Sequence, residues 1–251
     1  SAPRQYVIDS RIKRIDTSRS ATQLFENLPE LDITNIAESY RRDFETAANN
    51  SDIQLEWSEQ KFASVFAENI PNESALFVGS SRPIRDIESF AKARDGIKVF
   101  ANRGLAGIDG NLSTVFGIAD NFANTYAILG DLTFLHDVNA LLSPTESNCK
   151  IFVIDNNGGG IFSTLPQAGV NGFEKIFGTP QSANIAKIAE SFNCKVEKIK
   201  GESDLKRAIS HSVDGFQIYL VEVPNREKMA NNLKEIYAKA SSAVRIGFNL
   251  A

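Results

Sequence analysis

The sequence is poor in the residues that build disulfides and sulfur or imidazole metal centres. Its 251 residues include two cysteines and two histidines. Cys149 and Cys194 each stand at the start of a predicted strand, where a free thiol behaves as a small buried apolar side chain. His136 and His211 stand singly on predicted helices, without a second ligand at a metal-binding spacing. We expect neither a disulfide nor a metal site of these residues, which is typical of the reducing cytoplasm.

Long apolar runs and an excess of basic charge are also lacking. No stretch approaches the roughly 18 consecutive apolar residues of a membrane span, and the N-terminus has no apolar core of a signal peptide. The 27 Lys and Arg residues are outnumbered by 31 Asp and Glu residues, which gives a net charge of −4. This balance predicts a cytoplasmic protein without a nucleic-acid or membrane partner.

Two common phosphate-binding signatures, GxGxxG and GxxxxGK[ST], are absent, which counts against a Rossmann dinucleotide site and a P-loop. Apolar strands that alternate with helices are present instead. Strands are predicted over residues 75–78, 98–101, 125–129, 151–154, 195–199 and 217–223. The alternation predicts an α/β fold, with a doubly wound, mostly parallel six-stranded sheet flanked by helices.

The N-terminal part of the chain has a weaker pattern. Residues 5–9 predict one short strand with no visible partner strand nearby, followed by a polar loop. Residues 34–49 have helical spacing and predict a connecting helix.

Polar residues follow two neighbouring predicted strands in the centre of the chain. Gly130-Asp131 ends one strand, and the segment from Asp155 to Gly160 ends the next. The ends of neighbouring parallel strands meet at one edge of a sheet, so Asp131 and Asn156 are expected to be close. A carboxylate, an amide oxygen and a main-chain carbonyl suit Mg²⁺, which also takes phosphate oxygens. The simpler alternatives are that Asp131 caps the following helix and that residues 157–160 form a tight turn.

These residues resemble the signature of thiamine-diphosphate enzymes, in which Gly-Asp is followed by an Asn-Asn-Gly segment. Here Asn156 comes 25 positions after Asp131 (156 − 131). The resemblance implies thiamine diphosphate as the cofactor, with Mg²⁺ (or Mn²⁺) held by Asp131, Asn156 and the main-chain oxygen of Gly158. The chain departs from the family pattern in two places, with Asp155 in place of an Asn and Ala106 in place of a Ser.

Four further segments narrow the resemblance to the family of 2-succinyl-5-enolpyruvyl-6-hydroxy-3-cyclohexene-1-carboxylate synthases. They are residues 79–86, 102–110, 132–139 and 159–166, in the family's order. The resemblance implies a transferase of menaquinone biosynthesis, a carboligase that joins 2-oxoglutarate, with decarboxylation, to isochorismate.

The resemblance also implies a role for individual residues in the site. The residues expected to bind substrate are Ser81, Arg85, Arg103, Phe162 and Leu165. Those expected to contact the cofactor are Gly107, Ile108, Gly130, Asp131, Leu132, Asn156, Gly158, Gly159 and Ile161. Arg85 and Arg103 are expected in loops, where the planar guanidinium grips carboxylates. The simpler alternatives are solvated surface charges for the arginines and loop packing for the apolar residues.

The resemblance divides the chain into three parts. Residues 1–33 are similar to the end of a central domain, residues 34–56 to a connecting helix and linker, and residues 57–251 to a diphosphate-binding domain. The chain starts at Ser1 and its one methionine is Met229. We therefore expect a piece of a longer protein, or a chain that works with a separate partner.

No catalytic residue is expected in these 251 residues. The family's catalytic Glu lies on a pyrimidine-binding domain of a neighbouring subunit, so a homo-oligomer or a complex with that domain is implied, and the isolated chain is expected to be inactive. Two other functions are compatible with the sequence. One is another thiamine-diphosphate 2-oxo acid decarboxylase or carboligase, and the other is a non-catalytic cofactor-binding or assembly module.

Overall fold

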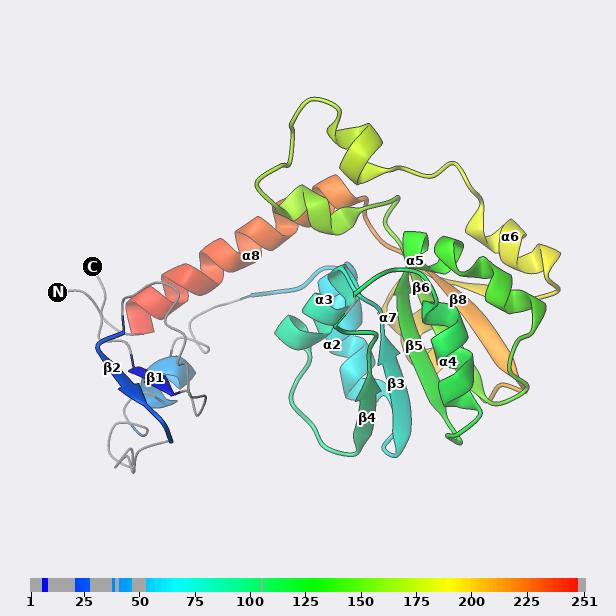
Figure 1. Cartoon of the computed structure of the whole chain (residues 1–251), viewed down its shortest axis with the longest axis horizontal. Helices are drawn as coiled ribbons and strands as arrows, with labels where there is room; N and C mark the ends of the chain where they lie inside the picture. The colour runs from blue at the N-terminus through cyan, green and yellow to red at the C-terminus, as the bar shows by residue number, and fades with distance from the viewer. Residues whose placement is uncertain are drawn as a thin grey trace. The chain divides into compact units, whose positions relative to one another are not determined.

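The computed structural model describes residues 6–8, 21–27, 38, 41–46, 53–104 and 106–247 (Figure 1). The chain forms two compact units, residues 53–239 and residues 1–52 with 240–251. None of the helices in the described part is long and apolar enough to cross a membrane. The larger unit contains the main sheet and is the one that positions the candidate site.

The smaller unit contains two short strands, β1 (Tyr6–Ile8) and β2 (Gln23–Phe25), which pair in parallel. The prediction that the first strand has no nearby partner is therefore wrong. β2 was missed because a three-residue strand in a polar stretch is too short to show a period. Residues 38 and 41–46 are helical, within the helix predicted over 34–49, and the rest of that range lies outside the described residues.

The larger unit is built on a six-stranded sheet in the order β4-β3-β5-β6-β8-β7. Every pair of neighbouring strands is parallel, which confirms the predicted fold class. The strands are β3 (Ser74–Val78), β4 (Ile97–Phe100), β5 (Thr125–Gly130), β6 (Cys149–Asp155), β7 (Val196–Ile199) and β8 (Phe216–Glu222). The central strands are almost continuously apolar because both faces of a parallel sheet are covered by helices.

One face of the sheet is covered by α2 (Glu59–Asn69), α3 (Arg82–Phe90) and α7 (Glu202–Ser210). α2 begins at Ser58, whose hydroxyl accepts the N–H of Lys61. Its aromatic residues Phe62 and Phe66 pack on Phe152 of β6, which stacks on Tyr219 of β8 with ring centroids 4.9 Å apart. Aromatic contacts thus fix α2 over the centre of the sheet.

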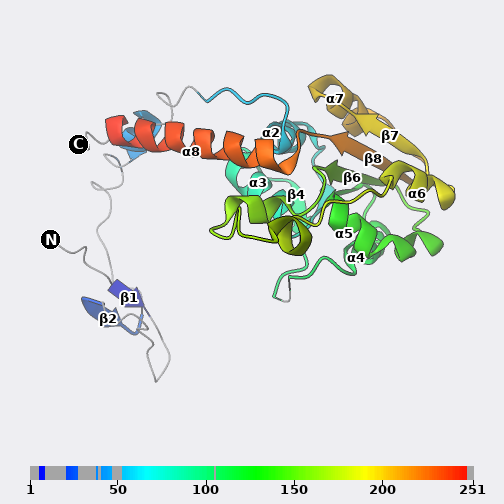
Figure 2. The same cartoon turned by 90° about the horizontal axis from the view of Figure 1, so that it is seen from above.

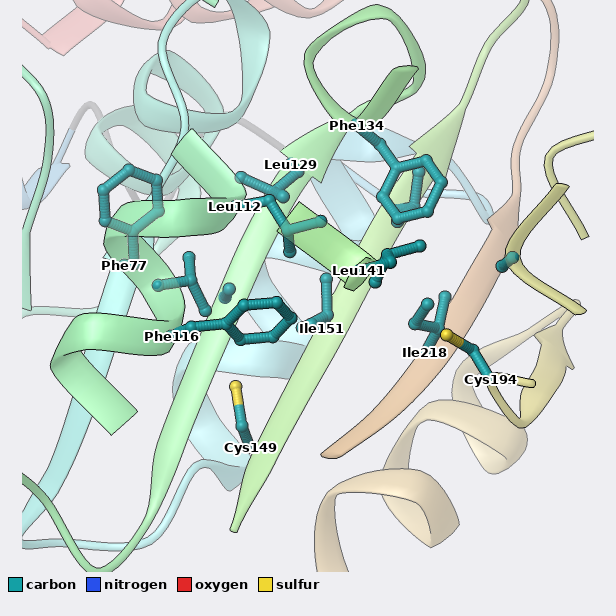
Figure 3. Close-up of a cluster of buried hydrophobic side chains, with 14 of the residues drawn as sticks. Phe77, Leu112, Phe116, Leu129, Phe134, Leu141, Cys149, Ile151, Cys194 and Ile218 are labelled. Carbon is teal, nitrogen blue, oxygen red and sulfur yellow. The ribbon is translucent and has the colours of Figure 1, made fainter. Parts of the chain in front are cut away.

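The opposite face is covered by α4 (Asn111–Ala119), α5 (Asp131–His136) and α6 (Ile185–Ser191). Alternate residues along the strands, such as Phe77, Leu129 and Ile151, form the hydrophobic core on this face of the sheet (Figure 3). Figure 2 shows the sheet between the two helix layers, with α2 and α7 on one side and α4, α5 and α6 on the other. Both cysteines are free and buried, as the sequence predicts.

Helix α3 was not predicted from the sequence. Arg85 was expected in a loop, but a helix already starts at Arg82. Pro83 in its first turn has a backbone angle suited to helix initiation, and Ile84 and Ile87 pack on the core. Arg85 therefore lies on a helix and not in a loop.

The order of the strands places a ligand crevice at a defined point. From β3 the chain runs outward to the edge strand β4 and then returns to β5 on the other side of β3. The strand order therefore reverses between β3 and β5. Open α/β sheets bind ligands beyond the carboxyl ends of the strands at such a point.

The last helix of the chain, α8 (Arg226–Gly247), follows β8. Trp57, one residue before the cap of α2, donates its indole N–H to the main-chain oxygen of Glu222 at 2.8 Å. This bond ties the start of α2 to the end of β8.

Candidate functional site

A cavity of about 410 Å³ lies beyond the carboxyl ends of β3, β5 and β6. It brings together most of the residues that the sequence analysis assigned to the site. These are Ser81, Arg85, Arg103, Ile108, Gly130, Asp131, Leu132, Asn156, Gly158, Gly159, Ile161 and Phe162. Gly107 and Leu165 do not line the cavity, and the side chain of Leu165 is 38% exposed.

The register of the central strands brings Asp131 and Asn156 to the same edge. Gly130 pairs with Ile154, so Asp131 leaves β5 at the level where β6 ends. Asp131 is the first residue of α5 and the cap position is Gly130, so Asp131 does not cap this helix. Its carboxylate instead accepts the N–H of Gly158 at 2.7 Å and that of Leu132 at 2.7 Å.

The carboxyl group of Asp131 is buried at the base of the cavity. Burial raises its pKa to about 6, against the hydrogen bonds from Gly158 and Leu132, which favour the ionised form. A nearby cation would favour the ionised form further. Asp131 is therefore a buried acceptor in an environment that favours a bound positive charge.

Asn156 has one satisfied and one unsatisfied end. Its Nδ2 donates to the carboxylate of Glu59. Its Oδ1 is buried and has no hydrogen-bond partner among the residues that the structure describes. Because a buried polar atom without a partner is costly, this oxygen marks a position where a ligand atom would fit.

The loop after β6 approaches other main-chain atoms so closely that side chains are excluded. Gly158 has a φ of +116°, and a Cβ there would lie 2.2 Å from the Gly178 oxygen. A Cβ on Gly159 would lie 2.3 Å from the oxygen of Phe177. Both oxygens belong to one helical turn, Glu174–Gly178. These glycines are needed for the packing of this turn against the loop.

Arg226, the first residue of α8, also holds this loop. Its guanidinium donates to the main-chain oxygen of Asn157 at 2.5 Å and pairs with the carboxylate of Glu174. Its own N–H donates to the main-chain oxygen of Asn156 at 3.1 Å. The simple tight turn considered for residues 157–160 is thus a loop fixed by three separate segments.

These donors fit a hard divalent cation and a diphosphate. Asp131 supplies a carboxylate, Asn156 an unpartnered amide oxygen, and Gly158 a main-chain oxygen that also accepts the N–H of Gly160 at 2.8 Å. No group of three or more His, Cys, Asp or Glu side chains within the described ranges could hold a metal ion. A cation here would therefore depend on amide and main-chain oxygens, as Mg²⁺ sites often do.

Two arginines, Arg85 and Arg103, also line the cavity. Arg85 donates to the main-chain oxygen of Ser81 at 2.7 Å, and this serine has a positive φ of 76°. Arg103 is exposed, and among the described residues it has no hydrogen bond or ion pair. Both guanidinium groups line the cavity and retain N–H groups for an anionic ligand.

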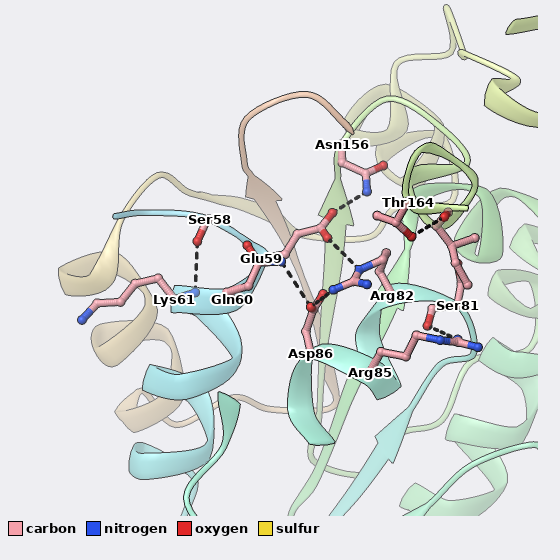
Figure 4. A network of polar contacts seen from close by, with 11 residues as sticks. Ser58, Glu59, Gln60, Lys61, Ser81, Arg82, Arg85, Asp86, Asn156 and Thr164 are labelled. Carbon is pink, nitrogen blue, oxygen red and sulfur yellow. Dashed lines mark hydrogen bonds and ion pairs between the residues drawn. The ribbon is translucent and has the colours of Figure 1, made fainter. Parts of the chain in front are cut away.

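A buried charged network beside Asn156 was not predicted from the sequence. Glu59 of α2 and Arg82 and Asp86 of α3 are each less than one-tenth exposed (Figure 4). Arg82 pairs with Asp86, and its Nε lies 3.8 Å from a Glu59 oxygen, while Gln60 donates to Asp86 at 3.2 Å. Burial, with the negative charge of Asp86, raises the pKa of Glu59 to about 8.

The position of Glu59 explains why it was missed. A Glu in the first turn of an amphipathic helix is favoured by the helix dipole alone, so its sequence context indicates nothing unusual. Its partner Asn156 is 97 residues away in the chain. The one signal in the sequence was that an acidic residue comes just before the buried apolar residues of α2.

Comparison with known proteins gives a consistent result. The family described as "Thiamine pyrophosphate enzyme, C-terminal TPP binding domain" matches residues 87–223. Thiamine pyrophosphate is another name for thiamine diphosphate. The X-ray structure of a candidate thiamin diphosphate-dependent enzyme from Mycobacterium smegmatis superposes with a TM-score of 0.52 at 18% identity, covering 67% of this chain and 32% of that one. This likeness concerns the fold.

Curated relatives are 2-succinyl-5-enolpyruvyl-6-hydroxy-3-cyclohexene-1-carboxylate synthases. Those of Thermobifida fusca and Lysinibacillus sphaericus are 38% and 39% identical over 74% and 78% of this chain. The Leuconostoc citreum synthase is 34% identical over 86% of it. The matched regions cover 34%, 36% and 41% of the respective relatives, so the chain spans little more than a third of their length. The resemblance seen in the sequence is confirmed.

Proposed function

Because the chain belongs to the family of C-terminal thiamine pyrophosphate-binding domains, we propose that it supplies the metal- and diphosphate-binding half of a 2-succinyl-5-enolpyruvyl-6-hydroxy-3-cyclohexene-1-carboxylate synthase site. The observation that carries the proposal is the buried Oδ1 of Asn156, unpartnered within the described residues, beside Asp131 in the cavity. The similarity to synthases from several bacteria supports the substrate assignment.

Asp131, Asn156 and the main-chain oxygen of Gly158 would hold Mg²⁺ or Mn²⁺, and through it the diphosphate of thiamine diphosphate. When bound, this cofactor supplies the electron sink for decarboxylation of a 2-oxo acid and for the new carbon–carbon bond. The chain's own part is to anchor, orient and enclose. Ile108, Ile154 and Phe162 line the cavity with apolar surface, which excludes water from the reacting groups.

The arginines would bind the acidic substrates, 2-oxoglutarate and isochorismate. Arg103 donates to no other residue of the described ranges, and Arg85 donates to Ser81 through one nitrogen, Nη1. A guanidinium binds a carboxylate through two parallel hydrogen bonds, which fixes its orientation as well as its position. Arg85 on α3 and Arg103 after β4 would thus hold two carboxylates at separate points of the cavity.

The remaining parts of the site would come from a pyrimidine-binding domain that carries the catalytic Glu, in a homo-oligomer or a complex. The share of the relatives that the chain spans supports this part of the proposal. The product would enter menaquinone biosynthesis. The 251-residue chain by itself is expected to have little or no synthase activity.

The test is a calorimetric titration of thiamine diphosphate into the full chain, with and without Mg²⁺. Saturable binding that requires Mg²⁺ is expected. The matched control is Asp131→Asn, which keeps the shape of the side chain but removes its charge, and which is expected to abolish the Mg²⁺-dependent binding. Absence of binding to the unsubstituted chain, or equal binding to the variant, would overturn the proposal.

A further inference from the structure

The orientation of the Asn156 side chain is set by a residue outside the metal-binding loop. We propose that Glu59 is a positioning residue, which fixes the end of the Asn156 amide that faces a bound cation; this rests on the proposed metal and diphosphate site. Glu59 lies on α2 and Asn156 directly after β6, and the amide Nδ2 donates to the Glu59 carboxylate.

An asparagine amide has two ends of almost the same shape and opposite chemistry. The oxygen can bind a cation, whereas the NH₂ group, as a donor, cannot. In Asn156 the NH₂ end is directed at Glu59 and the oxygen is left without a partner in the described part of the chain (Figure 4). The Glu59 oxygen that accepts from the NH₂ end therefore favours the orientation in which the Asn156 oxygen is available to a metal ion.

The space around the amide supports the same orientation. A Cβ on Gly160 would lie 2.7 Å from the Nδ2 of Asn156. The glycine therefore leaves room for the NH₂ group, which donates its hydrogen bond to Glu59. The same three-glycine segment thus serves both the loop packing and the direction of the amide.

Glu59 is itself held in place by groups that do not belong to the metal loop. Its second carboxylate oxygen lies 3.8 Å from Arg82 Nε, and Arg82 is fixed by Asp86. The helix that carries Glu59 starts at the hydroxyl cap of Ser58. The carboxylate is thus anchored from two helices, α2 and α3, so it can impose an orientation on Asn156 and not simply follow it.

The first experiment compares Glu59→Gln with the unsubstituted chain. A glutamine has the same size, but its own NH₂ group can donate to the Asn156 oxygen and hold the amide reversed. We expect the affinity for Mg²⁺, titrated calorimetrically at saturating thiamine diphosphate, to fall about 10- to 100-fold. Glu190→Gln changes an exposed carboxylate and is the matched control, with unchanged affinity expected.

The second experiment combines Glu59→Gln with Asn156→Asp. An aspartate has two equivalent oxygens, so the glutamine introduced on α2 can donate to one while the other faces the cation. We expect the double variant to recover most of the Mg²⁺ affinity that Glu59→Gln loses. A purely structural role of Glu59 gives no reason for such a rescue, since the second substitution would add to the damage.

The outcomes separate the two proposals. If the unsubstituted chain binds thiamine diphosphate with Mg²⁺ but Glu59→Gln binds Mg²⁺ equally well, the role of Glu59 is wrong and the proposed function stands. The same holds if the double variant binds no better than the single one, or if circular dichroism shows that Glu59→Gln is unfolded. If the unsubstituted chain shows no Mg²⁺-dependent binding, the proposed function fails and the role of Glu59 with it.

Discussion

The carboxylate of Asp131 accepts the main-chain N–H of Gly158 at 2.7 Å. This bond joins the first residue after β5 to the loop after β6, two segments separated by 27 positions. It orients the carboxylate and fixes the loop that presents Asn156. Both strands are central in the sheet, so the donors stand on the most buried part of the fold.

Gly158→Ala is expected to destabilise the chain by about 2–4 kcal/mol, because its Cβ would lie 2.2 Å from the Gly178 oxygen and its φ is positive. Urea unfolding followed by circular dichroism measures the change. Gly169→Ala is the matched control: φ there is +82°, but nothing lies within 4 Å of the added carbon. A similar loss in both variants would show that backbone strain, and not the close contact, is the cause.

Arg226→Ala is expected to lower the unfolding free energy by about 1–3 kcal/mol and to weaken binding of thiamine diphosphate with Mg²⁺. The substitution removes the donor to the oxygen of Asn157, one of the contacts that fix the loop after β6. Thermal unfolding and the calorimetric titration measure both effects. Arg207→Ala removes an exposed, ion-paired arginine and is expected to change neither by much. Unchanged cofactor affinity in Arg226→Ala would contradict this role.

The stability of the metal-free chain is expected to fall as the pH rises from about 4.5 to about 8. The pKa of Glu59 is raised from its ordinary value of 4.5 to about 8 by burial and by Asp86, so the folded chain binds more protons than the unfolded chain over this interval. The stabilisation is fully present below 4.5 and is lost as the pH passes 8. One proton changes the unfolding free energy by at most about 1.4 kcal/mol per pH unit.

Urea unfolding at several pH values between about 5 and 8 checks this slope. Asp131 also makes the stability fall as the pH rises, but over a lower pH interval, since burial raises its pKa to about 6. Glu59→Gln should therefore flatten the profile, most clearly above a pH of about 6, whereas Glu190→Gln should leave it unchanged. An unaltered slope in Glu59→Gln would show that Glu59 is not the group that takes up the proton.

Removal of the metal is expected to abolish the stabilisation by cofactor. With Mg²⁺ and thiamine diphosphate at about 100 times its dissociation constant, the unfolding free energy should rise by about 2.7 kcal/mol. EDTA should reverse the resulting shift in melting temperature. If thiamine diphosphate stabilises the chain equally with EDTA present, the oxygen donors of Asp131 and Asn156 do not act through a metal ion.

Much of the fold could be predicted from the sequence because it rests on local patterns. The central strands β3, β5, β6 and β8 are almost continuously apolar, and each is bounded by polar turns or helices. Among the described strands and α-helices, β2 and α3 were missed. β2 is too short to show a period, and α3 begins within a segment whose glycine and serines are typical of a loop, although Pro83 and the spacing of Ile84 and Ile87 indicate a helix.

In the candidate site, Asp131 and Asn156 were predicted from the sequence, whereas Glu59 was not. Asp131 and Asn156 stand at the ends of recognisable strands, so the topology of a parallel sheet brings them together. Glu59 reaches the site through the packing of α2 on β6, a contact between positions 97 apart. Such a contact depends on how a helix packs on the sheet, and no local pattern of residues encodes it.

The hydrogen bond from the Trp57 indole to the main-chain oxygen of Glu222 has one more consequence. It is the single tryptophan of the chain. Its emission therefore reports one location, the junction between the start of α2 and the end of β8, with Phe62 at a ring distance of 6.5 Å. Glu59 lies two positions further along. The chain thus has an intrinsic fluorescent probe close to Glu59, the proposed positioning residue, and detachment of α2 from the sheet can be followed by fluorescence without a label.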